Sequence, residues 1–299
     1  MSRPSRTTIA EADKERLLPL RKQRDRDKLS ARQVSSFQRF ILEFYKEHRR
    51  DLPWRNTDNA YHILVSEIML QQTQVERVVE KYDRFITAFP DFLSLAKAPL
   101  KNVLNVWQGL GYNRRAISLV KLANMIVAEY GGTFPDDVRG LMKLPGIGQA
   151  TAGCLLAFVF RKPSVFIETN IRRVFIHHFF HDREGIHDDE IMPLVKTTLY
   201  KSNPRDWYYA LMDYGSMLKR QIENPNRKSA HYARQSAFEG SDRKIRGAIL
   251  KVLVGRSSMT ERDIAKTIGI KQERIGKILS GLIREGFITK KTTVYRIAE

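Results

Sequence analysis

The chain has 299 residues, 42% of them hydrophobic, which is enough for two or three packed domains. Its 52 Lys and Arg residues outnumber its 33 Asp and Glu residues, and the net charge of +19 favours a polyanionic partner, either nucleic acid or an acidic membrane. No apolar run is long enough to span a bilayer, the N-terminus lacks the apolar core of a secretory signal, and the single cysteine, Cys154, excludes an internal disulfide. We therefore expect an intracellular protein that binds nucleic acid.

Helical patterns dominate the first 240 residues. Residues 1–32 are polar and rich in mixed charge, and we expect a tail or a loosely held helix there. Apolar residues recur at helical spacing over 36–48 and again over 61–89, with an interruption near Gln72. The same spacing predicts three more helices, over 100–109, 114–132 and 136–144.

The stretch LPGIGQATAG, residues 144–153, places two glycines around Ile147 at the start of a helix. Glycine loses conformational entropy there, so the pair indicates either a tight turn between helices or a close approach of backbone N–H groups to an anion. The helix that follows, over 149–160, is apolar on every side and is predicted to be buried.

Residues 224–244 are polar and predict a linker or an irregular loop, and the chain changes character after them. Three short helical patterns precede an alternating segment, 288–299, that is typical of a hairpin. This order predicts a winged helix-turn-helix with 271–285 as its recognition helix. Such domains bind DNA, but they also bind proteins.

Glu67 lies in the middle of an otherwise apolar helix, on the face that also carries Ile63, Leu64 and Leu70. A carboxylate buried there tends to hold a proton near neutral pH and to act as a general acid. The alternative is a glutamate that pairs with a nearby arginine.

The stretch WQGLGYNRR, residues 107–115, is a second glycine turn, and it presents Tyr112 next to Arg114 and Arg115. An aromatic ring beside cations on a rigid turn suits stacking on a nucleic-acid base. The alternative is an aromatic residue of the core.

Glu168 follows a short apolar run and stands at the expected start of a helix. A carboxylate at that position is commonly a helix cap, since it accepts hydrogen bonds from the first free N–H groups. It is also a candidate for a second acid in a catalytic pair.

Taken together, the motifs resemble the helix-hairpin-helix (HhH-GPD) DNA glycosylases over about residues 40–220. The motifs that carry the resemblance are, in order, LPWR, SEIMLQQTQV, GLGY, LPGIGQATAG, ETNIRRV and LMDYGSM. MutY-type adenine mismatch glycosylases are the most similar branch, and endonuclease III is a more distant one. The fold that this resemblance implies is all-α, a two-lobed helix-hairpin-helix glycosylase fold plus a small C-terminal winged helix-turn-helix.

We expect four parts along the chain. They are residues 1–32 as a basic polar tail, 33–58 with 164–240 as a helical lobe that carries Glu168 and no cluster, 59–163 as a six-helix barrel lobe with Glu67 and the hairpin, and 241–299 as the winged helix-turn-helix.

The resemblance also assigns roles to residues. Glu67 matches the general acid that protonates adenine N7 of a flipped nucleotide, and Glu168, with Asn170 beside it, matches the carboxylate that stabilises the oxocarbenium-like sugar. The residues that match positions lining the base pocket are Trp54, Arg55 and Asp213. Those expected to contact DNA are Gln71, Gln72, Tyr112, the backbone of Gly146, Gly148 and Gln149, and, in the winged part, Lys271, Lys277 and Arg284.

The chain departs from the family at four points. The second carboxylate is usually Asp in the family, whereas this chain has Glu168. Ala150 stands where endonuclease III has the lysine that it uses for lyase chemistry. Where the family has four cysteines that bind an iron–sulfur cluster, this chain has other residues, at about Lys219, Asn226, Ser229 and Gln235. A winged helix also takes the place of the C-terminal domain that recognises 8-oxoguanine in MutY-type enzymes. We therefore expect no iron–sulfur cluster and no lyase activity, while a monovalent cation at the hairpin, common in the family, stays open.

Three functions follow as hypotheses. The first is a monofunctional DNA glycosylase of base excision repair that removes adenine opposite guanine or oxidised guanine. The second excises thymine, uracil or a damaged base, and the third is a non-catalytic protein that binds mismatches or lesions. In each case we expect a monomer whose partner is double-stranded DNA with a mispair or damaged base, and no membrane. The expected location is cytoplasmic at the nucleoid, or nuclear in a eukaryote.

Overall fold

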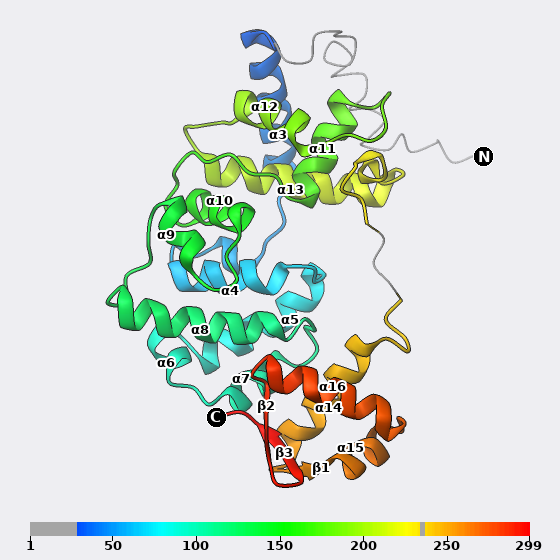
Figure 1. Cartoon of the computed structure of the whole chain (residues 1–299). Helices are drawn as coiled ribbons and strands as arrows, with labels where there is room; N and C mark the ends of the chain where they lie inside the picture. Colours follow the sequence, from blue (N-terminus) through cyan, green and yellow to red (C-terminus); the bar gives the residue numbers. More distant parts are fainter. Residues whose placement is uncertain (1–28, 234–236) are drawn as a thin grey trace, which may run out of the picture. The chain divides into compact units, whose positions relative to one another are not determined.

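The computed structural model describes residues 29–233 and 237–299 (Figure 1). Helices form most of this part, and its three named strands all follow residue 258, so the predicted all-α class is confirmed. The expected N-terminal tail falls outside the described residues as far as residue 28. Within the described ranges, no helix is both long and apolar enough to cross a membrane.

The described residues divide into two compact units. Unit 1 combines residues 29–51 with 148–233, and unit 2 combines 52–147 with 237–299. The boundaries of the four expected parts stay a prediction.

Unit 1 is a helical bundle around an aromatic core. Phe37 packs edge-on against Phe175, Phe179 and Trp207, with ring centroids 5.7, 5.3 and 6.0 Å away. These rings come from three helices, so the core joins segments far apart in sequence. The elements of unit 1 are α3 (Ala31–His48), α10 (Gln149–Phe158), α11 (Thr169–Phe179), α12 (Asp188–Thr198), α13 (Pro204–Gln221) and the short 3₁₀ helix η2 (Pro225–Lys228).

The helices α11 and α13 approach one another at the backbone. A Cβ atom on Gly215 of α13 would lie 2.4 Å from the carbonyl oxygen of Asn170, so only glycine fits at that crossing. This contact fixes the start of α11, where Glu168 stands.

Unit 2 contains a second set of helices that pack through apolar and aromatic faces. Phe85 meets Trp107 edge-on at 5.7 Å, and Tyr61 meets Phe92 edge-on at 5.0 Å, each pair joining two different helices. The first elements of unit 2 are η1 (Pro53–Arg55), α4 (Ala60–Leu70), α5 (Val75–Ala88), α6 (Phe92–Ala96), α7 (Leu100–Trp107), α8 (Arg114–Glu129) and α9 (Val138–Lys143).

The C-terminal part of unit 2 is the three-helix, hairpin arrangement expected from the sequence. Its elements are α14 (Asp242–Gly255), β1 (Met259–Thr260), α15 (Glu261–Ile268), α16 (Gln272–Arg284), β2 (Ile288–Lys291) and β3 (Val294–Ile297). The strands form an antiparallel sheet in the order β1-β3-β2, and Ile288 pairs with Ile297. Thr260 is the N-cap of α15, because its hydroxyl accepts the N–H of Asp263 at 3.2 Å.

The start of the polar stretch predicted as a linker or an irregular loop is an ordered, partly buried loop. Asn226 and Ser229 are buried, and Ser229 forms a parallel bridge with Ile186. Two backbone hydrogen bonds make this bridge, from Ile186 N to Lys228 O at 3.0 Å and from Ala230 N to Ile186 O at 2.9 Å. The loop therefore belongs to the packing of unit 1.

Candidate functional site

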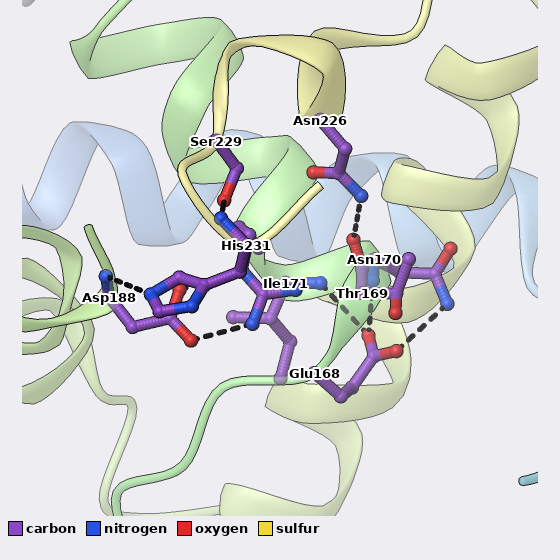
Figure 2. Close-up of polar contacts among 9 residues, drawn as sticks. Glu168, Thr169, Asn170, Ile171, Asp188, Asn226, Ser229 and His231 are labelled. Atoms are coloured by element: carbon purple, nitrogen blue, oxygen red, sulfur yellow. Dashed lines mark hydrogen bonds and ion pairs between the residues drawn. The ribbon is translucent and has the colours of Figure 1, made fainter. Parts of the chain in front are cut away.

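Glu168 is the N-cap of α11, and its carboxylate is held by three donors. Its Oε1 accepts the backbone N–H groups of Asn170 at 2.7 Å and Ile171 at 2.9 Å, and its Oε2 accepts the Asn170 side-chain Nδ2 at 3.2 Å (Figure 2). Burial raises the pKa of Glu168, while the two backbone hydrogen bonds and the nearby guanidinium of Arg173 act in the opposite direction. Glu168 therefore caps α11, and these hydrogen bonds fix its partly buried carboxylate.

Arg173 holds Asn170 in place, and the sequence reasoning missed it. Its guanidinium donates to Asn170 Oδ1 at 2.6 Å, to the Gly215 carbonyl at 2.7 Å and to Asn224 Oδ1 at 2.9 Å. Only 2% of Arg173 is exposed, and burial lowers its pKa. A signal existed, since Arg173 lies on the same helical face as Asn170, three residues on.

The segment that leads into Glu168 is anchored by buried polar contacts. The Ser164 hydroxyl donates to the Gly153 carbonyl at 2.6 Å, and the Tyr208 hydroxyl donates to the Ser164 carbonyl at 2.5 Å. A Cβ atom on Gly153 would lie 2.8 Å from the Cβ of Phe166, so α10 passes close to this segment. These contacts give the carboxylate of Glu168 a rigid support.

The ordered loop after α13 braces the first turn of α11 from another side. Asn226 Nδ2 donates to the Thr169 carbonyl at 2.8 Å (Figure 2). In the same loop, the Ser229 hydroxyl accepts the His231 N–H at 3.1 Å, and His231 Nε2 accepts the Asp188 N–H at 3.3 Å. The loop thus connects the N-termini of α11 and α12.

This loop contains two of the four positions at which the family has the cysteines of its iron–sulfur cluster. Lys219 lies in α13, Asn226 and Ser229 lie in or next to η2, and Gln235 lies outside the described residues. An iron–sulfur cluster takes thiolate ligands, and the one cysteine of the chain, Cys154, is buried in α10, so the donor set does not fit a cluster. In the described ranges, no group of three or more His, Cys, Asp or Glu side chains could hold a metal ion.

Asp213, expected near the base pocket, is buried in α13 and accepts two hydrogen bonds from Arg50. The backbone N–H of Arg50 lies 2.9 Å from one carboxylate oxygen, and its Nε lies 2.6 Å from the other. The carboxylate of Asp213 therefore holds the chain just after α3. A role toward a base stays a prediction.

In unit 2, Glu67 lies on α4 and is partly exposed. The neighbouring element η1 packs against α4 and ends at Arg55. Trp54 is 2% exposed and meets Tyr82 edge-on at 5.3 Å, so it is part of the hydrophobic core. The structure thus places Trp54 and Arg55 on the element that contacts the helix of Glu67.

Two turns of unit 2 contain residues with left-handed backbone. Gln72, with a φ of 56°, lies after α4, and Tyr112, with a φ of 46°, lies before α8. Residues other than glycine rarely adopt this backbone conformation, and such backbone strain concentrates at functional sites. Gln72 is exposed, while Gln71 and Tyr112 are partly buried.

Arg115 joins these two turns through buried hydrogen bonds. Its side chain donates to the carbonyls of Ile68, Met69 and Gln71 at 2.8, 2.7 and 2.6 Å, and to Gly111 at 3.1 Å. Arg115 is 9% exposed, and burial lowers its pKa to about 10. It therefore stabilises the turns from inside and offers no surface to a base.

The two glycines of the hairpin differ in their backbone conformation and in the space around them. Gly146 has a φ of 85°, and a Cβ atom there would lie 3.0 Å from the Cβ of Ser118. Gly148 is the N-cap of α10, and no described atom lies within 4 Å of a Cβ placed there. The fold therefore requires glycine at 146 and leaves open space at 148. Gln149 and Ala150, the first residues of α10, are exposed.

The winged part exposes the three basic residues expected to contact DNA. Lys271 is the N-cap of α16, and Lys277 and Arg284 follow on the same helix. Lys277 forms an exposed ion pair with Glu273 at 3.3 Å, a pair that water screens strongly.

The family model of the "HhH-GPD superfamily base excision DNA repair protein" matches residues 65–198. An adenine DNA glycosylase of Buchnera aphidicola subsp. Baizongia pistaciae is 37% identical over 61% of this chain, and the chain spans about half, 52%, of that relative's length. An adenine DNA glycosylase of Mycolicibacterium smegmatis is 33% identical, with 71% of this chain and 78% of the relative covered. Among solved structures, a thermostable thymine-DNA glycosylase matches at 27% identity and a TM-score of 0.58, with 65% of this chain and 91% of that chain covered.

Proposed function

Because this chain belongs to the HhH-GPD superfamily of base excision DNA repair proteins, we propose that it is a DNA glycosylase that removes adenine from a mispair with guanine or oxidised guanine. The names of the bacterial relatives support adenine as the base. The proposed enzyme hydrolyses the N-glycosidic bond and leaves an abasic site in double-stranded DNA.

The observation that carries the proposal is the fixed, partly buried carboxylate of Glu168. Two backbone N–H groups and the Asn170 side chain orient it, and desolvation by the surrounding protein raises its pKa. A carboxylate in such a setting stabilises a neighbouring positive charge more strongly than one in water. The sugar of a departing base develops that charge.

Glu67 takes the role of general acid in this proposal. A flipped adenine becomes a better leaving group when N7 receives a proton, and a partly buried carboxyl group in an apolar helix is suited to donate it. Water then attacks the sugar carbon, whose charge Glu168 has stabilised.

The hairpin is the proposed phosphate contact. The N-terminus of α10 presents backbone N–H groups, and the open space at Gly148 allows an oxyanion to approach them closely. Gly146 shapes the turn, and Gln71, Gln72 and Tyr112 are proposed to contact the duplex near the flipped nucleotide. No lysine follows the hairpin, since Ala150 stands there, so the proposed enzyme has no lyase activity at this position.

A second candidate is a thymine or uracil glycosylase. The match to the thermostable thymine-DNA glycosylase favours it, because that match covers nearly all of the solved chain. The two candidates share the proposed sites of Glu67 and Glu168 and differ in the base pocket.

An abasic-site assay separates the candidates. The purified chain is incubated with duplexes in which adenine, thymine or uracil faces each normal base or 8-oxoguanine, and hot alkali then cleaves at abasic sites. We expect product from adenine opposite guanine or 8-oxoguanine, and none without the alkali step. Product from thymine or uracil alone supports the second candidate.

The matched control for this assay is Glu168→Gln, which keeps an oxygen at the cap and removes the charge. We expect it to bind the same duplexes and release no base. A parent chain that binds mismatched duplexes without releasing any base would instead be the non-catalytic binder, and the glycosylase proposal would be wrong.

A further inference from the structure

Tyr112 contacts the winged part of unit 2 directly. Arg243, on α14, donates from Nη1 to the Tyr112 hydroxyl at 2.9 Å, and its guanidinium carbon lies 5.8 Å from the centre of the Tyr112 ring. The guanidinium carbon of Arg115 lies 5.4 Å from that same centre. Two arginines, 128 positions apart in sequence, therefore contact one aromatic ring.

A second contact joins the same two segments. Glu285, which ends α16, accepts Nε and Nη2 of Arg114 at 2.8 and 2.7 Å, and it also accepts Nη2 of Arg246 at 2.5 Å. The bidentate geometry and the charges make these hydrogen bonds stronger than neutral ones. Arg114 is the first residue of α8, two positions after Tyr112, so both ends of this turn are held from the winged part.

The backbone of Tyr112 explains why such contacts are needed. A bulky residue with a φ of 46° is strained, and it keeps that conformation only where its surroundings over-determine it. The Arg115 side chain donates to backbone carbonyls of this turn, and these hydrogen bonds fix the backbone around Tyr112. Arg243 reaches the hydroxyl at the far end of the ring, which fixes the direction in which the ring points.

We propose that the winged part sets the orientation of the Tyr112 ring through Arg243, and that this orientation governs which base is accepted opposite the excised one. Arg243 is then a positioning residue for specificity. The inference rests on the proposed glycosylase function and on Tyr112 as a contact to the duplex. It separates two tasks of the winged part, since exposed Lys271 and Lys277 supply affinity and Arg243 supplies selectivity.

Chemistry favours a selectivity role for Arg243 over simple phosphate binding. Its charge is engaged with the hydroxyl and the ring of Tyr112, whereas a phosphate contact releases counterions from a cation that faces solvent. Loss of Arg243 should therefore change the ranking of opposite bases more than the overall affinity.

The test compares four full-length variants with the parent: Arg243→Ala, Arg243→Lys, Tyr112→Phe and the double variant Arg243→Ala/Tyr112→Phe. The matched control is Arg274→Ala, because Arg274 is a winged-part arginine that donates to Asp242 of that part and to the carbonyl of Gly240 just before it. For each protein, single-turnover excision rates and dissociation constants are measured on duplexes that differ only in the base opposite the target.

For each protein, the spread is the ratio of the fastest to the slowest excision rate among the opposite bases. We expect Arg243→Ala and Tyr112→Phe each to reduce (compress) this ratio by about fivefold. The double variant should show no more compression than Arg243→Ala alone, because that change already removes the hydrogen bond to the Tyr112 hydroxyl. Arg243→Lys should restore part of the spread, since its ammonium group also donates to the hydroxyl. The Arg274→Ala control should keep the parent's ranking.

Two results would overturn the inference while leaving the glycosylase proposal intact. One is an Arg243→Ala variant that ranks opposite bases as the parent does. The other is a double variant whose compression is the product of the two single ones. A parent that excises nothing and binds all duplexes alike would reject the proposed function itself, and the inference with it. Tyr112→Phe removes one oxygen only, so it keeps the test decisive if Arg243→Ala folds poorly.

Discussion

At the scale of single residues, Glu168 shows how one side chain serves folding and chemistry. Its carboxylate caps α11 and is the proposed stabiliser of the sugar cation. The sequence presented these as competing explanations, and the structure makes them compatible, because both backbone donors bind Oε1 while the Asn170 side chain binds Oε2.

The first prediction concerns the side-chain length at position 168. Glu168→Asp withdraws the carboxylate by about 1.5 Å of bond length, and a misplacement of that size should lower the single-turnover excision rate on the order of a hundredfold. Glu168→Gln should abolish base release and keep DNA binding. An aspartate variant faster than the parent would show that the glutamate hinders the reaction.

The second prediction concerns pH. The pKa of Glu168 is raised above its ordinary value of 4.5. The ionised carboxylate, which the reaction needs, therefore forms at a higher pH than it does in an ordinary glutamate. The excision rate should therefore rise with pH through that raised pKa. The folded state holds this proton more tightly than the unfolded state, so the contribution of Glu168 to stability falls as pH rises from 4.5 through the raised pKa. Melting temperatures of Glu168→Gln over the same range should lack that fall, and a parallel decline in both proteins would contradict it.

Arg115 shows what the sequence could and could not give at this scale. Its neighbour Arg114 is exposed and Arg115 is buried, although the two are adjacent and identical in type. The helical pattern contained the distinction, since Arg115 shares its face with Leu119 and Leu122, which are fully buried. Its seven hydrogen bonds, to the end of α4 and to the two turns, involve residues up to 47 positions away, and no local pattern reveals them.

At the scale of elements, the hairpin and the start of α10 combine a structural glycine with one that is proposed to face a phosphate. The sequence located both, and it left open whether the turn or an anion explained them. The structure separates the two positions by their space and their backbone, because Gly146 is left-handed and crowded, whereas Gly148 has an ordinary φ of −94° and open surroundings.

The third prediction uses this matched pair. Gly146→Ala should destabilise the fold by roughly 1–2 kcal/mol, the cost of a left-handed residue with a Cβ atom. Gly148→Ala should leave the melting temperature unchanged and weaken binding to duplex DNA, because the added methyl group occupies the space proposed for a phosphate oxygen. Calorimetry and fluorescence anisotropy measure the two effects. Equal DNA affinity in Gly148→Ala and the parent would remove the phosphate from this site.

The fourth prediction concerns the end of α16. Hydrogen bonds from Arg114, then those from Arg246, lower the pKa of Glu285 from 4.5 to about 2. A carboxylate with a lowered folded pKa stabilises the protein above pH 4.5, and this stabilisation is lost as pH falls from 4.5 through about 2. Glu285→Gln should therefore melt below the parent at pH 7, with the difference shrinking below pH 4.5. The exposed Glu273→Gln serves as control, and it should change little at any pH.

At the scale of the whole molecule, the charge of +19 remains the clearest sign of a DNA partner. Helix positions, both glycine turns and the winged part followed from periodicity and motif order. The contacts between distant segments did not, because Arg243 and Tyr112 are separated by 131 positions and the loop at 224–233 has no periodic pattern. The candidate residues therefore follow from the sequence, whereas Arg173, which contacts Asn170, and Arg243, which contacts Tyr112, do not.

The fifth prediction concerns salt. In the full-length chain, replacing Lys271, Lys277 and Arg284 by alanine together should weaken DNA binding and flatten its log–log salt dependence by about 0.9 per lost phosphate contact. The ranking of opposite bases should stay that of the parent. A triple variant with an unchanged salt slope would show that the winged part meets DNA through other residues.

Cys154 has a practical consequence for watching the protein at work. The only thiol of the chain is 5% exposed and lies inside the apolar helix α10, so maleimide dyes should leave the native protein essentially unlabelled. A cysteine introduced at exposed Gln72 would then be the single reactive handle. A fluorophore at that position would report the approach of a duplex to the turn in real time, with no need to remove any native cysteine first.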